Sequence, residues 1–323
     1  MVSAYPAIFS PLRIRGVELP NRIVVPPLVQ VRPITSPEGL AWYRRLASGS
    51  PGMVIVEATN IDDFGRELTP ETLRPLVDVI QQAGAAAFVQ LFPGPLGRGR
   101  RPDDLTVGEI EAIIDAYGAA ASFCRQAGFD GVEPHGAHSY LLHDFFKPDQ
   151  NHRTDNYGGS LDNRCRMGVQ IVRRMRQAAG ADFLLGYRHT PTGAEYGIEE
   201  SLVFAERLIE AGMDVLDVSP ARKESAADLA EPFKKRLPVP VIAVGGMEEP
   251  DEAEAALREG RCDLVAVGRQ MIADARWPAK VRQGRLDDIR KCTKCNKGCH
   301  GNLSKRLPVA CVLWPEGELD AFG

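Results

Sequence analysis

The sequence predicts a (β/α)8 barrel, in which eight parallel strands alternate with helices, followed by a short cysteine-rich tail. Two observations support this fold class. Eight apolar, strand-like runs recur along the 323 residues, with stretches of helical spacing between them. Three joints between a helix and the next strand also have similar sequences, which is typical of a repeated βα unit. The runs cover residues 23–28, 53–58, 86–91, 132–135, 183–188, 215–219, 241–244 and 264–268. We expect the barrel in residues 1–285 and the tail in residues 286–323.

Helix signals lie between the runs. Residues 106–109 have the pattern of a capping box, in which two side chains satisfy backbone amides of the first helical turn. Apolar residues at helical spacing follow it, namely Ile110, Ile113, Ile114 and Tyr117, and a second such set is Leu202, Ala205, Leu208 and Ile209. At the shared joints, Gly128, Gly212 and Gly260 are expected to adopt the left-handed conformation that ends a helix. An open doubly wound sheet is the alternative, disfavoured because no Gly-x-Gly-x-x-Gly follows the first strand.

Composition limits the classes of partner. With 44% apolar and 25% charged residues, the chain can bury a large core. Its formal net charge of -4 gives no broad basic surface, so nucleic acid and anionic membranes are not expected as partners. No apolar run reaches the roughly 18 residues that span a bilayer. The first residues lack the basic and apolar regions of a signal peptide, which predicts a cytoplasmic protein.

The run at 132–135 leads directly into three ring side chains, His135, His138 and Tyr140. Side chains at the carboxyl ends of barrel strands point into a crevice, so we expect these three to share a pocket. One histidine at a strand end is commonly structural, whereas two histidines and a tyrosine this close together favour a catalytic site. The polar, glycine-bearing segment 151–164 is typical of a structured active-site loop.

Glycines follow the last two strand-like runs, at Gly245, Gly246 and Gly268, and Arg269 comes next. In (β/α)8 barrels, the loops after strands seven and eight commonly bind phosphate through backbone amides. Arg269 would add charge-assisted hydrogen bonds to the phosphate oxygens. These residues predict a phosphate-bearing cofactor. Arg188 closes the fifth apolar run, where a buried cation requires a partner.

Four of the seven cysteines crowd into the tail, at Cys292, Cys295, Cys299 and Cys311. This clustering does not suit a disulfide framework and indicates a metal or cluster site. Zinc is the conventional alternative, although structural zinc sites favour two paired hairpins and this tail has one Cys-x-x-Cys. Four thiolates also match a 4Fe-4S cluster. Basic residues surround the cysteines, namely Lys291, Lys294, Lys297, Lys305 and Arg306.

The block His-Gly-Ala-His-Ser-Tyr-Leu-Leu-His at 135–143, together with segment 151–164, resembles the flavin-dependent old yellow enzyme family. Residues 11–24, which lead into the first predicted strand, also resemble the start of the barrel in that family. This resemblance implies that the cofactor is FMN, with Arg188 near flavin N1 and O2. The implied flavin contacts are Pro27, Leu28, Val29, Ala58, Gln90 and Arg188. Two positions depart from the family pattern, which often has Cys or Thr where Val29 stands and His where Pro93 stands.

The spacing of the tail cysteines resembles the 2,4-dienoyl-CoA reductase and trimethylamine dehydrogenase branch of that family, which implies a 4Fe-4S cluster. The resemblance further implies reduction of an activated C=C bond in a small-molecule substrate. His135 and His138 would then hold the substrate's carbonyl oxygen, and Tyr140 would donate the proton. Two alternatives are an amine dehydrogenase or demethylase of the same branch, and an electron-transfer subunit without its own turnover. We expect a redox partner, a ferredoxin or a flavoprotein reductase, to serve the cluster, with NAD(P)H as an indirect electron source.

Overall fold

The computed structural model describes residues 4–94, 99–221 and 226–323 of the chain. Eight parallel strands close into a barrel in the order β10-β3-β4-β5-β6-β7-β8-β9, which confirms the predicted (β/α)8 fold. The strands are β3 (Ile23–Val25), β4 (Met53–Asn60), β5 (Ala86–Phe92), β6 (Gly131–Gly136), β7 (Leu184–His189), β8 (Val215–Val218), β9 (Val241–Val244) and β10 (Leu264–Ala266).

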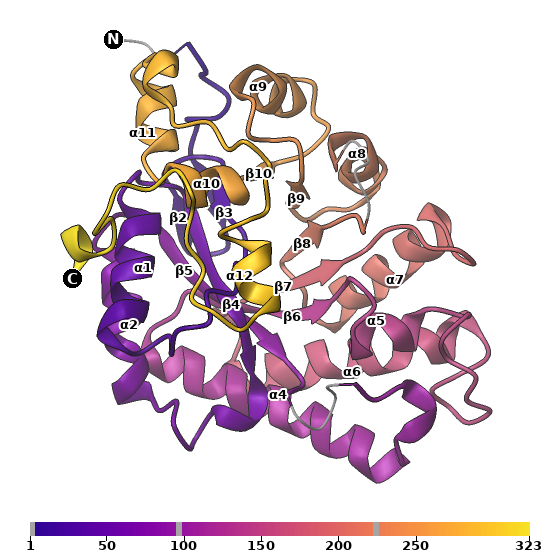
Figure 1. Cartoon of the computed structure of the whole chain (residues 1–323). Helices are drawn as coiled ribbons and strands as arrows, with labels where there is room; N and C mark the ends of the chain where they lie inside the picture. Colours follow the sequence, from indigo (N-terminus) through magenta and orange to yellow (C-terminus); the bar gives the residue numbers. More distant parts are fainter. Residues whose placement is uncertain (1–3, 95–98, 222–225) are drawn as a thin grey trace.

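Helices follow the strands and surround the barrel, as Figure 1 shows. They are α1 (Pro37–Ala47), α2 (Pro70–Gln81), α4 (Val107–Ala127), α5 (Leu141–Phe146), α6 (Leu161–Ala179), α7 (Ile198–Ala211), α8 (Ala226–Arg236), α9 (Pro250–Arg258), α10 (Arg269–Ala273), α11 (Trp277–Arg282) and α12 (His300–Ser304). Among the described residues, no helix is both long enough and apolar enough to cross a bilayer.

The strands alternate between the barrel interior and the helix layer. Ile55 and Phe88 belong to the apolar cluster that fills the barrel, whereas Val54 and Val56 belong to the larger cluster under the helices. Period-two alternation is what a closed parallel sheet with two covered faces requires. The continuous apolar runs in the sequence reflect this burial on both sides.

The predicted helix ends are confirmed. The Thr106 side chain accepts a hydrogen bond from the Glu109 amide, and the Glu109 carboxylate accepts one from the Thr106 amide, so α4 begins with a capping box. Gly128, Gly212 and Gly260 have φ angles of 96°, 114° and 70°. An L side chain is strained in this left-handed region, which explains glycine at the three joints.

The first barrel strand is shorter than predicted. The sequence predicts a strand over 23–28, but β3 ends at Val25 because Pro26 and Pro27 have no amide hydrogen to donate to a neighbouring strand. The last strand likewise ends at Ala266 rather than at residue 268. The residues beyond each strand are irregular and line the cavities described below.

A hairpin that we did not predict precedes the barrel. Strands β1 (Leu12–Ile14) and β2 (Val17–Leu19) pair antiparallel across a two-residue turn. Ile14 and Leu19 pack into the apolar cluster inside the barrel. The hairpin therefore packs against the amino-terminal end of the barrel.

The tail folds back over the barrel and does not extend into solvent. Figure 1 shows it crossing the barrel, with the carboxyl terminus beside α1. The indole N–H of Trp314 donates to the Ile272 carbonyl at 2.7 Å, and the Val309 amide donates to the Gln30 carbonyl at 3.0 Å. Near the chain end, buried Arg45 pairs with Glu318 at 2.9 Å. The tail is thus fixed to α10, to the loop after β3 and to α1.

Candidate active site

A layer of polar side chains lies inside the barrel, above its apolar filling. Gln90 donates to Glu133 at 2.8 Å, and the Arg188 guanidinium lies 3.4 Å from the Asp217 carboxylate. Each pair joins neighbouring strands in register. All four side chains are almost fully buried, and Gly186 leaves room for Glu133, since a Cβ there would lie 2.9 Å from the Glu133 Cβ.

Burial changes the protonation of this layer. Burial raises the pKa of both Glu133 and Asp217, the charge of Asp217 raises that of Glu133 further, and the Arg188 charge opposes both effects. Two buried carboxyl groups beside one guanidinium do not both ionise readily. The layer therefore retains a proton near neutral pH.

Above this layer lies a cavity of about 370 Å³. Its walls are mostly apolar, with a few polar groups at one side, as is usual for a small-molecule site. Predicted site residues that line it are Pro27, Leu28, Val29, Ala58, Gln90, His135, His138, Tyr140, Arg188 and Arg269. The structure thus brings together residues that six different strands and their following loops contribute.

His135, His138 and Tyr140 form a compact triangle on this cavity. The His135 ring lies 5.3 Å from the His138 ring and 5.1 Å from the Tyr140 ring, measured between centroids. His138 and Ser139 adopt φ angles of 61° and 57°, which reverse the chain after β6. The reversal places the His138 ring within 3.0 Å of the Ser219 hydroxyl at the end of β8.

Both imidazoles are neutral at physiological pH. Burial, and secondarily the Arg188 charge, lowers the pKa of His138 to about 4 and holds that of His135 well below its ordinary value. A neutral imidazole has one N–H donor, and two such donors suit an uncharged or partly charged oxygen. The pair can therefore hold a substrate carbonyl without titrating over the physiological range.

Several buried polar atoms in the described part of the chain make no hydrogen bond. They include Nε and Nη1 of Arg188 and Nδ1 of His135. Buried donors of this kind are normally satisfied, so their position on the cavity fits a bound group that carries acceptors. The pyrimidine edge of a flavin offers such acceptors, and a cation beside it stabilises the negative charge of the reduced ring.

A second cavity of about 980 Å³ adjoins the first and shares Pro27, Leu28, Arg188, Arg269 and His300 with it. The predicted glycines, Gly245, Gly246 and Gly268, line the second cavity. Gly245 and Gly246 are both left-handed, with φ angles of 119° and 76°. Such a turn exposes amide groups to an anion. The donor set therefore fits a phosphate beside the flavin ring.

The four tail cysteines line one small cavity next to the first. Cys299 and Arg269 line both cavities. Burial raises the pKa of Cys311, and the neighbouring thiols Cys292, Cys295 and Cys299 raise it further, so the four sulfur atoms are close in space. Within the described residues, no three His, Cys, Asp or Glu side chains meet closely enough for a single metal ion. Four thiols are a donor set that fits an iron-sulfur cluster and also a structural zinc ion.

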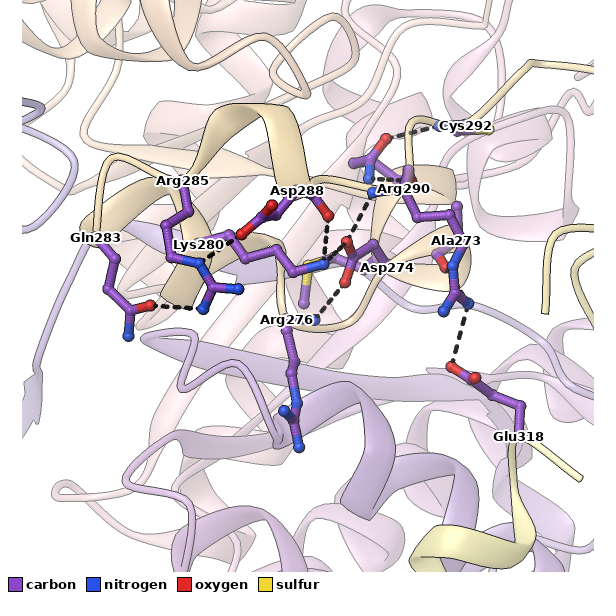
Figure 2. Close-up of polar contacts among 12 residues, drawn as sticks. Ala273, Asp274, Arg276, Lys280, Gln283, Arg285, Asp288, Arg290, Cys292 and Glu318 are labelled. Carbon is purple, nitrogen blue, oxygen red and sulfur yellow. Dashed lines mark hydrogen bonds and ion pairs between the residues drawn. The ribbon is translucent and has the colours of Figure 1, made fainter. Parts of the chain in front are cut away.

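Residues 290–311, which contain the four tail cysteines, are called the cysteine segment below. Figure 2 shows the polar contacts that hold the start of this segment on the barrel. Gln270 donates to the Arg290 carbonyl at 3.1 Å and accepts from the Cys292 amide at 2.9 Å. Asp274 accepts from the Arg290 amide at 2.9 Å and from Lys280 at 2.5 Å. Gln270 lies one residue after Arg269, which lines the second cavity. Its hydrogen bond to the Cys292 amide therefore connects the first tail cysteine directly to α10, the helix that follows β10.

Sequence reasoning missed some of the residues that line the cavities. Asn60 and Phe92 lie two residues beyond Ala58 and Gln90 on the same strands, and this spacing was a usable signal. Residues from the tail gave no such signal, because only the folded chain brings them to the barrel mouth. Those on the first cavity are Cys299, His300, Leu303 and Val309.

Fold and site together define a cofactor-dependent (β/α)8 oxidoreductase whose cavities suit a flavin and its phosphate. Residues 98–288, more than half of the chain, match the model of the NADH:flavin oxidoreductase / NADH oxidase family. The chain belongs to this family, which confirms the predicted relation to the old yellow enzymes.

Known relatives agree with this assignment. The chain is 34% identical to the NADH oxidase of Thermoanaerobacter brockii, with 96% of this chain and 56% of the relative covered. It is 29% identical to the cinnamate reductase of Clostridium sporogenes, with 98% and 58% covered. A solved 2-naphthoyl-CoA reductase superposes with a TM-score of 0.90 at 26% identity, covering 98% of this chain and 58% of that one. The chain therefore spans little more than half the length of these three relatives.

Proposed function

We propose that this protein is an FMN-dependent ene-reductase that reduces the C=C bond of an enone, enoate or enoyl thioester. The observation that carries the proposal is the triangle of His135, His138 and Tyr140 on an apolar cavity that adjoins a phosphate-binding cavity. Relatives named cinnamate reductase and 2-naphthoyl-CoA reductase support this substrate class.

The chain's own residues divide the reaction into binding, charge stabilisation and proton transfer. His135 and His138 donate hydrogen bonds to the substrate carbonyl oxygen, where negative charge develops as the bond is reduced. FMN held in the cavity would supply the hydride that the β-carbon receives. Tyr140 gives its hydroxyl proton to the adjacent carbon, so the alkene gains one hydride and one proton. Tyr140 is 48% exposed and can regain its proton from water.

The cysteine segment would return electrons to the flavin through a 4Fe-4S cluster held by Cys292, Cys295, Cys299 and Cys311. Cys299 lines the first cavity, whereas Cys295 is exposed at the surface. A cluster between them would connect the solvent side to the flavin cavity. Each turnover requires two electrons, which a one-electron donor protein delivers in two steps.

The donor that best fits this surface is an acidic redox protein. Lys291, Lys297, Lys305 and Arg306 are exposed around Cys295, on a protein whose net charge is -4. Leu307, 49% exposed, adds an apolar contact. A positive patch of this kind speeds association with an acidic partner and makes it sensitive to salt. A ferredoxin or an acidic flavoprotein reductase fits these requirements, with NAD(P)H as an indirect source.

The test is anaerobic mixing of photoreduced enzyme with cinnamate, an aliphatic enone or an enoyl thioester, followed by flavin absorbance. At least one alkene should reoxidise the flavin and yield its saturated product in a one-to-one ratio. If no alkene reoxidises the flavin while an amine reduces the oxidised enzyme, the protein is an amine dehydrogenase. If neither compound changes the absorbance, the chain acts as an electron-transfer subunit and the proposal fails.

A further inference from the structure

The phosphate cavity is built by both the barrel and the cysteine segment. Gly245, Gly246 and Gly268 come from the barrel loops, whereas Lys294 and His300 come from the tail. Lys294 is the residue before the exposed Cys295. A cation of the cysteine segment therefore stands at the cavity that suits the phosphate of the flavin.

A carboxylate also lines this cavity. Glu248 follows the glycine turn after β9, and its side chain is 23% exposed. A phosphate monoester carries nearly two negative charges at pH 7, so an unpaired carboxylate in the same cavity opposes its binding. Lys294 neutralises this carboxylate, because its ammonium group lies 2.7 Å from the Glu248 oxygen. With Lys294 in place, Arg188 and Arg269 remain as cations for the phosphate region.

The backbone around Lys294 is fixed in an unusual conformation. Lys294 and Asn296 adopt φ angles of 55° and 58°, which cost conformational energy in residues other than glycine. The Asn296 side chain accepts a hydrogen bond from Arg269 at 2.9 Å. Arg269 thus holds the loop that carries Lys294, and at the same time it lines the phosphate cavity.

We propose that Lys294 is a phosphate-selectivity residue: by neutralising Glu248 at the cavity, it lets the protein hold FMN in preference to a flavin without phosphate. The cysteine segment would then serve cofactor binding as well as electron transfer. The inference rests on FMN as the flavin of the proposed function, and it does not depend on the alkene chemistry.

The experiment compares FMN with riboflavin, which has the same ring but lacks the phosphate. Flavin-depleted, full-length protein with its cysteine segment intact is titrated anaerobically, and quenching of flavin fluorescence gives both dissociation constants. For Lys294→Gln we expect the FMN constant to rise about tenfold, as for the loss of one partly exposed charge interaction. The riboflavin constant should stay within about twofold, and the FMN effect should shrink at high salt.

Matched variants separate charge from loop structure. Lys294→Arg should keep FMN affinity, and Lys235→Gln, which removes the lysine of an exposed ion pair with Glu231 outside the cavity, should change neither constant. In Glu248→Gln/Lys294→Gln the carboxylate and its partner are both gone, so FMN affinity should return close to that of the wild type. Unchanged FMN binding in Lys294→Gln, or an equal loss for FMN and riboflavin, would overturn the inference. Wild type that binds neither flavin would instead contradict the proposed function.

Discussion

Tyr140 differs from the two histidines beside it in its exposure to solvent. Tyr140 is 48% exposed, whereas His135 is 6% exposed and lacks a hydrogen-bond partner for Nδ1 in the described part of the chain. A proton donor must regain its proton from solvent at every turnover. Groups that hydrogen-bond a substrate carbonyl oxygen stabilise it most strongly where water is excluded. The exposures therefore agree with the roles that we propose.

Replacing Tyr140 with Phe tests the proton-donor role. The variant should keep the ring packing against Phe92 and His135 but lose the acidic proton. Flavin photoreduction should be unaffected, and reoxidation by an alkene should slow about 10²- to 10⁴-fold in stopped-flow absorbance. His135→Ala should also weaken ligand binding, whereas His152→Ala, an exposed histidine outside the cavity, should change nothing. Normal reoxidation in Tyr140→Phe would assign the proton to water or another acid.

Glu57 is a buried acid next to the flavin-lining Ala58. Its carboxyl group accepts hydrogen bonds from the Tyr43 hydroxyl at 3.1 Å and from the Gln30 amide at 3.2 Å. Burial raises the pKa of Glu57 to about 8, although these hydrogen bonds oppose the shift. The folded protein therefore holds a proton on Glu57 at neutral pH.

This proton makes stability depend on pH in a defined direction. An unfolded glutamate loses its proton near pH 4.3, so between that pH and about 8 the folded state binds more protons. The free energy of unfolding should fall as pH rises through this window. Glu57→Gln, which keeps an acceptor oxygen, should flatten the decline in melting temperature between about pH 5 and about pH 8. The control variant Glu67→Gln changes an exposed glutamate and should decline as steeply as the wild type. If Glu57→Gln declined equally steeply, Glu57 would be ionised in the folded protein.

At the scale of elements, the proposed cluster depends on the four thiols of the cysteine segment, and the segment is held by Gln270 of α10. Cys295→Ser removes one thiolate at an exposed position. We expect the variant, purified without air, to lose iron and acid-labile sulfide. It should still bind FMN through the glycine turns and Arg269 of the barrel loops, with an affinity reduced by no more than in Lys294→Gln. Cys262→Ala, which removes a buried thiol before β10, should retain full iron. Zinc at one equivalent without iron in wild type would contradict the cluster.

Elements differ in how well the sequence predicts them. All eight barrel strands were predictable, because burial on both faces leaves mostly apolar runs. The capping box of α4 and the glycine joints were predictable, because each has a local backbone cause. The β1–β2 hairpin was not, because its strands have three residues each and Ile14 and Leu19 are buried only by distant strands.

The same distinction holds for the site. His135, His138 and Tyr140 lie within one short stretch of sequence, and all of them line the cavity, as do the residues at the other strand ends. Their roles remain predictions until they are measured. Glu248, Lys294 and His300 could not be assigned to the phosphate cavity from the sequence, because they meet there only after the tail folds back over the barrel.

At the scale of the whole molecule, three cavities adjoin one another and share Arg269. The cysteine cavity shares Arg269, Ile272 and Cys299 with the flavin cavity, and the flavin cavity shares Arg188 and Arg269 with the phosphate cavity. A surface-exposed cysteine, Cys295, therefore lines the cysteine cavity, and the His135–Tyr140 pair lines the cavity next to it. Our central claim is that electrons enter through the cysteine segment and leave through the reduced substrate.

The most direct measurement is the rate at which reduced ferredoxin reduces the bound flavin, followed by stopped-flow absorbance without air. A ferredoxin that docks on the cysteine segment would pass its electrons through the cluster, so loss of the cluster should slow flavin reduction. The wild type should be reduced rapidly and in a salt-sensitive manner. Cys295→Ser should be reduced at least about tenfold more slowly, while its photoreduced flavin is still reoxidised by an alkene at the wild-type rate. Equal rates of reduction by ferredoxin in both proteins would contradict the claim.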